Sequence, residues 1–107
     1  MISTKEPNAS LARVGREEGA ELFEVVQKVE SALTKFCQHD KTNLLALMMV
    51  DPYVHFHFIP RYSGSRHFKG AGFVDKGWPG PPDLEAEVLS DSSLNAMALE
   101  IRDLIGK

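Results

Sequence analysis

The order of apolar and polar positions predicts two amphipathic helices, one near each end of the chain. Between Arg16 and Gln38, apolar residues recur at spacings of three and four, which places them in one stripe along a helix. The stripe consists of Leu22, Val26, Val29, Leu33 and Phe36. The same spacing predicts a second helix over residues 92–105, which Ser90, Asp91 or Ser92 is suited to cap.

The segment after the first helix predicts a buried strand. Residues 42–50 read TNLLALMMV, with a continuous apolar run over residues 44–50. A run of this length and character is typical of a strand that is covered on both faces. We therefore expect Met48 and Met49 to lie in the core.

The next segment predicts a strand with two different faces. Residues 53–60 read YVHFHFIP, in which polar and apolar side chains alternate. Asp51 and Pro52 before it predict a turn, so the two strand segments are expected to pair as an antiparallel hairpin.

The rest of the chain contributes little regular structure. Residues 1–4 suit a short strand, and the Gly-, Ser- and Pro-rich stretch after Arg61 leaves room for one more near residues 66–74. The WPGPP stretch, residues 78–82, fits neither a helix nor a central strand. This order predicts a single α+β domain over residues 1–107: an antiparallel sheet packed by a long helix, with residues 63–107 as a C-terminal extension that ends in a helix.

Composition narrows the functional classes. The chain has 107 residues and a net charge of −3, which argues against a DNA- or RNA-binding surface because phosphate contacts need clustered Lys and Arg. It has no apolar run long enough to span a membrane, and its N-terminus lacks the order of a signal peptide. A single cysteine, Cys37, fits a reducing cytoplasmic setting and a packing role in the first helix.

The paired histidines are the main chemical feature. On a strand, residues two apart point to the same face about 6.5 Å from one another. Tyr53, His55 and His57 therefore share one face, while the other face belongs to the core and carries Val54, Phe56 and Phe58.

Three interpretations of the histidine pair remain open. The histidines can lie on a solvated or half-buried face, or they can share a metal ion. A metal would need further ligands, for which the candidates are His39, His67, Asp51 and Asp75. In the third interpretation, a neutral imidazole attacks phosphorus and a second imidazole donates a hydrogen bond to the phosphate. That chemistry requires an acceptor that holds the other ring nitrogen of the nucleophile.

The stretch VHFHFIPRY, residues 54–62, resembles the signature of the histidine triad (HIT) superfamily, His-φ-His-φ-His-φ-φ with φ apolar, often followed by Pro-Arg. The helix and apolar strand before it, LMMVDP and GWPGPPDL are also similar to HIT-like proteins. The resemblance implies an α+β nucleotide hydrolase or nucleotidyl transferase. Such enzymes act at an α-phosphate, are usually homodimers, and use no metal or other cofactor at the histidines.

The resemblance also implies residue roles. It places the nucleophile at His55 and a phosphate donor at His57, while Tyr53 occupies the position of the first histidine and offers a hydroxyl instead. Asn43 falls near an Asn that many HIT proteins carry. Arg61 is placed either to reach a phosphate or to remain a solvated surface residue.

Departures from the HIT pattern favour an alternative. The short VDP, residues 50–52, stands where HIT enzymes carry a Gly-rich phosphate loop, and the sheet is expected to be short of the strands that HIT proteins carry before the position of Met1. A sheet that is short of strands leaves an edge that tends to pair with another chain, which adds to the expectation of a homodimer. The alternative is a non-catalytic HIT-like protein that binds a nucleotide or assembles with a partner.

Three further residues carry expectations. We expect His39 and His67 to be exposed to solvent. Trp78 is expected to pack under the C-terminal loop or to reach across a dimer to the partner's site.

Overall fold

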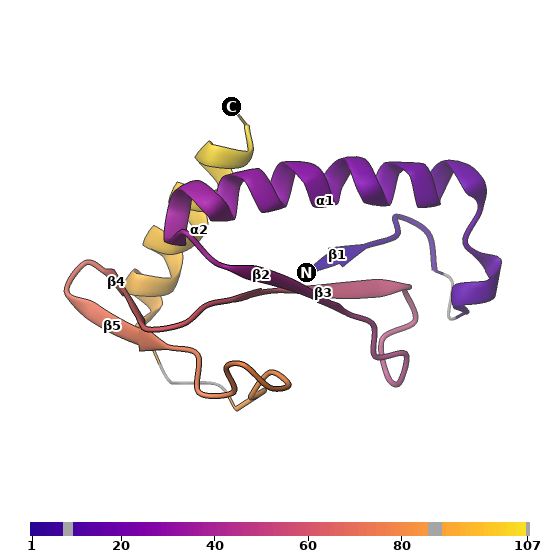
Figure 1. Ribbon diagram of the computed structural model, residues 1–107. Helices are drawn as coiled ribbons and strands as arrows, with labels where there is room; N and C mark the ends of the chain where they lie inside the picture. The colour runs from indigo at the N-terminus through magenta and orange to yellow at the C-terminus, as the bar shows by residue number, and fades with distance from the viewer. Residues whose placement is uncertain (8–9, 86–88, 107) are drawn as a thin grey trace.

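The computed structural model describes residues 1–7, 10–85 and 89–106, and Figure 1 shows the elements along the chain. In chain order these are β1 (Ile2–Ser3), the 3-10 helix η1 (Leu11–Arg13), α1 (Arg16–Cys37), β2 (Lys41–Leu45), β3 (His55–Arg61), β4 (Ser65–Phe68), β5 (Ala71–Val74) and α2 (Asp91–Ile105). Two helices and two antiparallel sheets confirm the predicted α+β class. The expected domain over residues 1–107 and the extension 63–107 both include residues outside the described ranges.

The strand that carries the histidines lies at the centre of the main sheet. The strand order is β1-β3-β2, and both pairings are antiparallel. The register places Ser3 beside His55, and Leu45 beside His57. Because it has a neighbour on each side, β3 is held more firmly than either of the strands that flank it.

Helix α1 lies over one face of this sheet (Figure 1). Val54, only 1 % exposed, and Phe56 line a hollow together with Leu22 and Val25 of α1. The apolar face of β3 is therefore turned toward α1, as the alternation predicts. His55 and His57 have the opposite orientation and face away from the helix.

Local signals explain where α1 begins and ends. The backbone N–H of Gly15 donates to the Glu18 carboxylate (3.3 Å), and Glu17 and Glu18 favour the positive end of the helix dipole. The helix ends where Gln38 adopts a left-handed conformation (φ 46°), with its N–H donating to the Thr34 carbonyl (3.0 Å). The predicted helix ends at Gln38, one residue after the observed end at Cys37.

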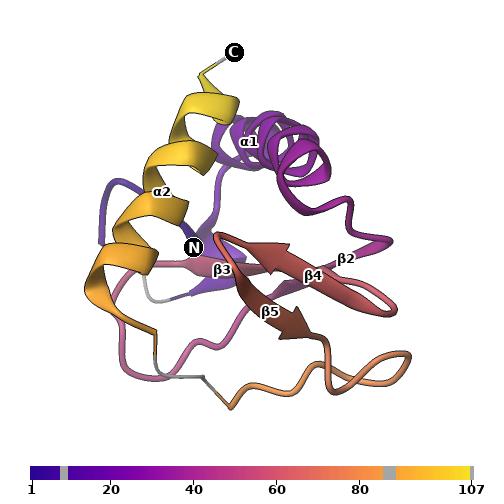
Figure 2. The same ribbon diagram turned by 90° about the vertical axis from the view of Figure 1, so that its left-hand side faces the viewer.

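Helix α2 packs against α1 near the β4–β5 hairpin (Figure 2). Its N-cap is Ser90, whose hydroxyl accepts a hydrogen bond from the Ser93 N–H (3.2 Å), so the predicted cap is confirmed. None of the helices in the described ranges has both the length and the hydropathy to cross a lipid bilayer.

The predicted strand over residues 42–50 is wrong in its second half. Strand β2 ends at Leu45, and residues 46–50 run outside the sheet. Met49 is 87 % exposed and Val50 is 95 % exposed, so this apolar run is not covered on both faces and Met49 is not a core residue. Met48 is half-buried. The run leaves the sheet because β2 pairs with β3 only as far as Leu45, opposite His57.

The second strand also begins later than predicted. Strand β3 starts at His55, so Tyr53 and Val54 precede it. The connection between β2 and β3 is the long loop of residues 46–54, instead of a tight turn at Asp51 and Pro52. We refer to residues 46–54 as the β2–β3 loop.

The segment after β3 forms a hairpin of two strands, whereas the sequence leaves room for one short strand near residues 66–74. Strands β4 and β5 pair antiparallel through Lys69 and Gly70, whose φ angles are 47° and 82°. Two successive positive φ values are typical of the type I′ turn that joins tightly paired strands. Residues 78–82 form neither helix nor strand, as predicted.

The small core makes its few buried side chains decisive for stability. Leu33 of α1 is only 9 % exposed, and Leu33→Ala is expected to lower the free energy of unfolding by about 2–4 kcal/mol, because it leaves a cavity. Urea denaturation measures this. The matched control is Leu99→Ala on α2, where the side chain is 51 % exposed and the expected change is below about 0.5 kcal/mol. Equal losses in the two variants would contradict the placement of the core.

Candidate functional site

His55 and His57 lie side by side on β3. Their ring centroids are 5.4 Å apart and the ring planes meet at 85°, so one ring presents its edge to the other. The strand backbone fixes this arrangement, since both residues belong to the same face of a paired, central strand. The structure therefore brings together the two residues that the sequence singles out.

The tautomer of His55 is set by the backbone. Its Nδ1 lies 2.9 Å from the carbonyl oxygen of Tyr53. A carbonyl oxygen only accepts hydrogen bonds. Nδ1 of His55 therefore carries the proton and donates a hydrogen bond to the Tyr53 carbonyl. In the neutral ring the other nitrogen, Nε2, then has a free lone pair.

The β2–β3 loop holds that carbonyl in place. The N–H of Tyr53 donates to the Asp51 carboxylate at 2.9 Å, which closes a short turn ahead of the strand. This series of contacts orders the end of the loop from Asp51 through Tyr53 to the His55 ring. The sequence predicts a role for the Tyr53 hydroxyl at the site, but the contact with His55 comes from the Tyr53 backbone.

The two imidazoles differ in exposure. His55 is 6 % exposed, whereas His57 is half-buried. His57 thus fits the interpretation of a solvated or half-buried histidine face, whereas the burial of His55 does not. A ligand that approaches from solvent meets the His57 side of the pair more readily than His55.

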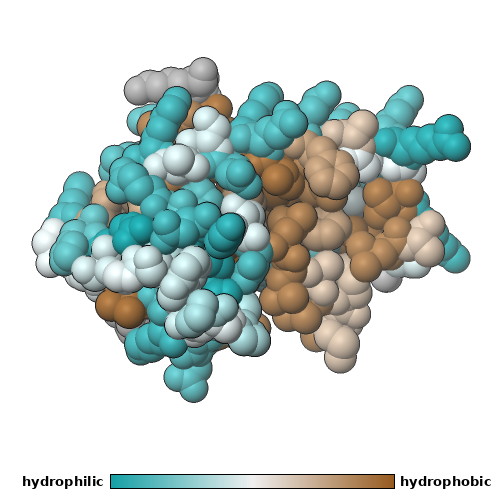
Figure 3. Space-filling model, viewed as in Figure 1, coloured by the Kyte–Doolittle hydropathy of each residue, from teal (hydrophilic) through white to brown (hydrophobic). Residues whose placement is uncertain are grey.

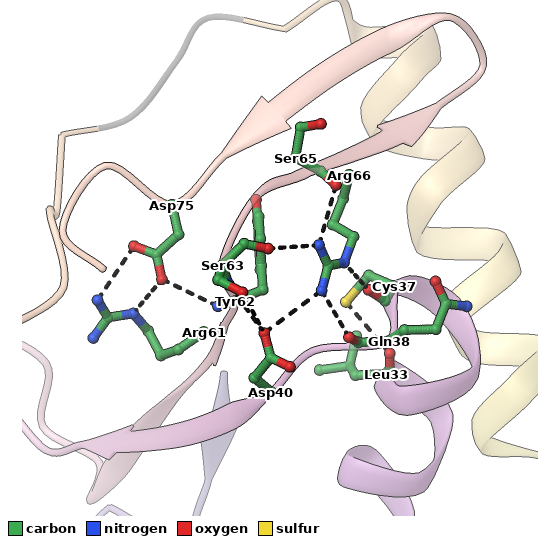
Figure 4. A network of polar contacts seen from close by, with 10 residues as sticks. All are labelled: Leu33, Cys37, Gln38, Asp40, Arg61, Tyr62, Ser63, Ser65, Arg66 and Asp75. Atoms are coloured by element: carbon green, nitrogen blue, oxygen red, sulfur yellow. Dashed lines mark hydrogen bonds and ion pairs between the residues drawn. The ribbon is translucent and has the colours of Figure 1, made fainter. Parts of the chain in front are cut away.

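Arg61 lies at the other end of β3, inside a polar cluster. It is 4 % exposed, and its guanidinium donates to both carboxylate oxygens of Asp75, at 2.7 and 3.2 Å (Figure 4). It also donates to the Asn43 side-chain oxygen at 2.6 Å and to the Gly80 carbonyl at 2.8 Å. We call this set of four residues the Arg61 cluster.

The Arg61 cluster changes the expectations for two site residues. Arg61 is buried, so it is not the solvated surface residue that was one of its two predicted states. Six residues separate it from His55, which is about 20 Å along a strand. Asn43 pairs with Ile59 and is engaged by Arg61. The structure thus places Asn43 and Arg61 together, but away from the histidine pair.

Asp75 is the acidic partner on which this cluster depends. Hydrogen bonds from the Arg61 guanidinium hold the pKa of Asp75 below its ordinary value, and the N–H groups of Tyr62 and Gly77 act in the same direction against the opposing effect of burial. The loop around Asp75 is packed closely, because a Cβ at Gly77 would run into the Pro81 carbonyl. Trp78 in this loop is half-buried, and its backbone N–H donates a hydrogen bond to the Asp75 backbone carbonyl at 3.2 Å.

A second arginine, Arg66, binds the carbonyl groups at the C-terminal end of α1. Arg66 on β4 donates to the carbonyls of Cys37 (2.7 Å) and Gln38 (3.0 Å), which lie where helix carbonyls lack intrahelical partners (Figure 4). It also lies 3.7 Å from the Asp40 carboxylate. Arg66 therefore fixes the hairpin to the helix end and has a structural task.

The remaining candidate residues lie apart from one another. Within the described ranges, no three His, Cys, Asp or Glu side chains come close enough together to hold a metal ion. His67 is exposed, as predicted, but His39 is half-buried against the Phe58 ring and contacts the Thr42 hydroxyl at 3.0 Å. Burial raises the pKa of the Cys37 thiol, whose hydrogen bond to the Leu33 carbonyl fits the expected packing role.

No protein-family model matches the chain, and no curated protein matches it significantly.

Removal of the Asp75 charge is expected to destabilise the protein in a pH-dependent way. Asp75→Asn leaves the buried guanidinium of Arg61 without its counter-charge, which costs about 3 kcal/mol of unfolding free energy at pH 7. Because the folded-state pKa of Asp75 is lowered, its contribution is present above the ordinary value of 3.8 and is lost as the pH falls through the lower folded-state value.

Denaturant titrations at pH 7 and over the acid range measure this effect. The difference between wild type and Asp75→Asn is expected to shrink as the pH falls below 3.8. Asp103→Asn, at an exposed carboxylate on α2, is the control and changes stability by less than about 0.5 kcal/mol. A pH-independent difference would show that the Arg61 pair does not carry the effect.

Proposed function

We propose that the protein is a HIT-like nucleotide hydrolase or nucleotidyl transferase that acts at an α-phosphate, with His55 as the nucleophile. One observation supports this most strongly. The Tyr53 carbonyl holds the proton on Nδ1 of His55, next to a second imidazole at 5.4 Å. This is the arrangement that phosphorus attack by a neutral imidazole requires.

The first displacement transfers the nucleotidyl group to His55. The Nε2 lone pair attacks the α-phosphorus, a P–N bond forms, and the bond from phosphorus to the leaving group breaks. The leaving group departs with the electron pair and takes up a proton from solvent. Positive charge develops on the His55 ring in this step, and the Tyr53 carbonyl dipole, 2.9 Å from Nδ1, stabilises it.

His57 has the role of a hydrogen-bond donor to the phosphate. A protonated ring nitrogen on His57 donates to a non-bridging oxygen, where negative charge increases in the transition state. The central position of β3 preorganises this donor, since a paired strand holds side chains more rigidly than a loop.

The second displacement restores the enzyme. Water, or the hydroxyl group of another acceptor, attacks the phosphorus of the nucleotidyl group. The P–N bond breaks and its electron pair returns to Nε2 of His55, while the attacking oxygen loses its proton to solvent or to His57. The choice between hydrolysis and transfer then depends on which acceptor occupies the site.

The burial of His55 favours a second candidate function. At 6 % exposure the His55 ring has little contact with solvent, and the Arg61 guanidinium is engaged by Asp75 and Asn43. A non-catalytic HIT-like protein, which binds a nucleotide or assembles with a partner, needs neither an accessible nucleophile nor a free cation.

A trapping experiment tests the proposed function. The full chain is incubated at mildly acidic pH with an adenosine phosphoramidate or a dinucleoside polyphosphate that is radiolabelled at the α-phosphate. Wild type is expected to acquire label that is acid-labile and stable in alkali, as a phosphoramidate is. His55→Ala abolishes the label, and His57→Ala lowers its rate of formation by about 10²-fold or more.

The control variant is His67→Ala, at an exposed histidine on β4, and it retains wild-type labelling. Circular dichroism of His55→Ala and of His55→Gln separates loss of the nucleophile from loss of the fold. Absence of label with every donor, combined with calorimetric binding of AMP or GMP, would replace the proposed enzyme with the binding protein. Absence of both label and binding would leave an interaction protein and overturn any nucleotide function.

A further inference from the structure

A cavity of about 480 Å³ lies between α1, α2, β3 and the β4–β5 hairpin. Its volume falls within the range of about 300–1,000 Å³ that is typical of small-molecule sites. On β3 its lining includes Phe58 and Pro60, which have the opposite orientation to His57 along the strand. The cavity therefore lies on the helix side of the main sheet, away from the histidine pair. Figure 3 shows mainly polar side chains over the hairpin end of this face of the molecule, whereas the apolar side chains of the hairpin line the cavity.

The apolar stripes of both helices face this cavity. Helix α1 contributes Val29, Leu33 and Phe36, and α2 contributes Met97, Ile101 and Ile105. The residues of each set are three or four positions apart, as one face of a helix requires. The two stripes do not pack fully against each other, and α2 has no buried residue over its whole length, Asp91–Ile105. The helices are in contact, yet they leave an apolar space between them and the strands.

Aromatic rings form much of the lining. Four of the six phenylalanines in the chain line the cavity: Phe36, Phe58, Phe68 and Phe73. The ring centroids of Phe36 and Phe68 are 5.4 Å apart, and the two rings are tilted by 41°. Rings in such an arrangement offer faces and edges to a further ring, which then gains more than the burial of its apolar area. The lining also includes Cys37 and Met97, whose sulfur atoms are favourable neighbours of aromatic rings.

Two polar residues of the lining are already engaged within the protein. The Cys37 thiol donates to the Leu33 carbonyl at 3.3 Å. The Arg66 guanidinium donates to the backbone carbonyls of Cys37, Gln38 and Ser63 at 2.7, 3.0 and 2.8 Å. Neither residue needs a ligand as a hydrogen-bond partner. A strongly polar molecule would therefore give up its hydration on entry without replacement.

The charge of the lining discriminates against cations. Among the described residues around the cavity, Arg66 is the one side chain with a full charge at pH 7, and none is acidic. This differs from the chain as a whole, whose net charge is −3. Apolar surroundings strengthen the repulsion between the guanidinium and a cationic ligand.

We propose that this cavity binds a flat, uncharged aromatic molecule of one or two fused rings. Apolar cavities hold water poorly, and a cavity lined by Leu, Ile and Phe side chains takes up benzene. The phenylalanine lining favours an aromatic over an aliphatic ligand, and Arg66 disfavours a cation. The proposal does not depend on a nucleotide function, because the cavity and the histidine pair lie on opposite sides of β3.

Arg66 keeps the walls of the cavity at a fixed separation. It lies on β4 close to Phe68, and its hydrogen bonds to the Cys37 and Gln38 carbonyls hold the hairpin to the end of α1. Its guanidinium also lies over the Tyr62 ring, 4.9 Å from the ring centroid. Because the hairpin wall is attached to the helix wall, little conformational entropy is lost when a ligand enters.

Calorimetric titration of the full chain with indole tests the proposal. One indole molecule is expected to bind per chain, with a dissociation constant of about 1 mM or lower. Cyclooctanol, an aliphatic alcohol with the same number of non-hydrogen atoms, is expected to bind at least about threefold more weakly. Tryptamine, which adds an ammonium group to the indole ring, is also expected to bind more weakly than indole.

Two variants test whether the cavity is the binding site. Met97→Trp fills the cavity and is expected to lower the affinity for indole at least about tenfold. Phe68→Leu keeps the lining apolar and lowers the affinity for indole about 2–10-fold, with a smaller effect on cyclooctanol. The matched control is Leu99→Trp, at a 51 % exposed leucine on the other face of α2, and it binds indole like wild type.

Nuclear magnetic resonance locates the bound ring. The methyl signals of Leu33, Met97 and Ile101 are expected to shift on titration with indole, while those of Leu99 stay unchanged. Circular dichroism verifies the fold of each variant, and Phe68→Leu decides the matter if Met97→Trp does not fold. Absence of saturable indole binding, or equal or tighter binding of cyclooctanol or tryptamine, would overturn the proposal. So would wild-type affinity in the folded cavity variants or loss of binding in the control.

Discussion

The two-residue period of β3 is the constraint on which the other features depend. Val54, Phe56 and Phe58 face apolar residues of α1, and burial of this face fixes the register of the strand. A slip by one residue would carry both imidazoles into the apolar layer under the helix. Burial of one face therefore places His55 and His57 together on the other face.

Two arginines, the buried Arg61 and the half-buried Arg66, hold segments that contribute few buried apolar side chains. Arg61 connects β3 to the end of β5 through Asp75, and Arg66 connects the hairpin to the end of α1 (Figure 4). Arg61 also connects β3 to β2 through Asn43. The chain thus compensates for few buried apolar residues with charge-assisted hydrogen bonds. These bonds are directional, so they fix the position of loops that apolar contacts alone would leave loosely placed.

Sequence patterns predict helices and strands, whose apolar side chains repeat every few residues. They do not predict contacts between residues that are far apart in the sequence. The helix boundaries and the histidine strand followed from spacing, because helices and alternating strands repeat over a few residues. The apolar run over residues 44–50 was misread as a covered strand, since such a run looks the same whether another strand, a helix or another molecule would cover it. The burial of Arg61 depends on Asp75, fourteen residues further along the chain. No spacing rule connects those two positions.

The contact between the Tyr53 carbonyl and the His55 ring has a consequence for sequence variation. Every amino acid supplies the same main-chain oxygen, so the proton on Nδ1 depends on the path of the backbone and not on the identity of residue 53. The tautomer of His55 therefore makes no demand on the side chain at position 53, and a tyrosine there leaves this contact unchanged. The contact depends instead on the residue that bends the chain, Asp51, whose carboxylate accepts a hydrogen bond from the Tyr53 N–H.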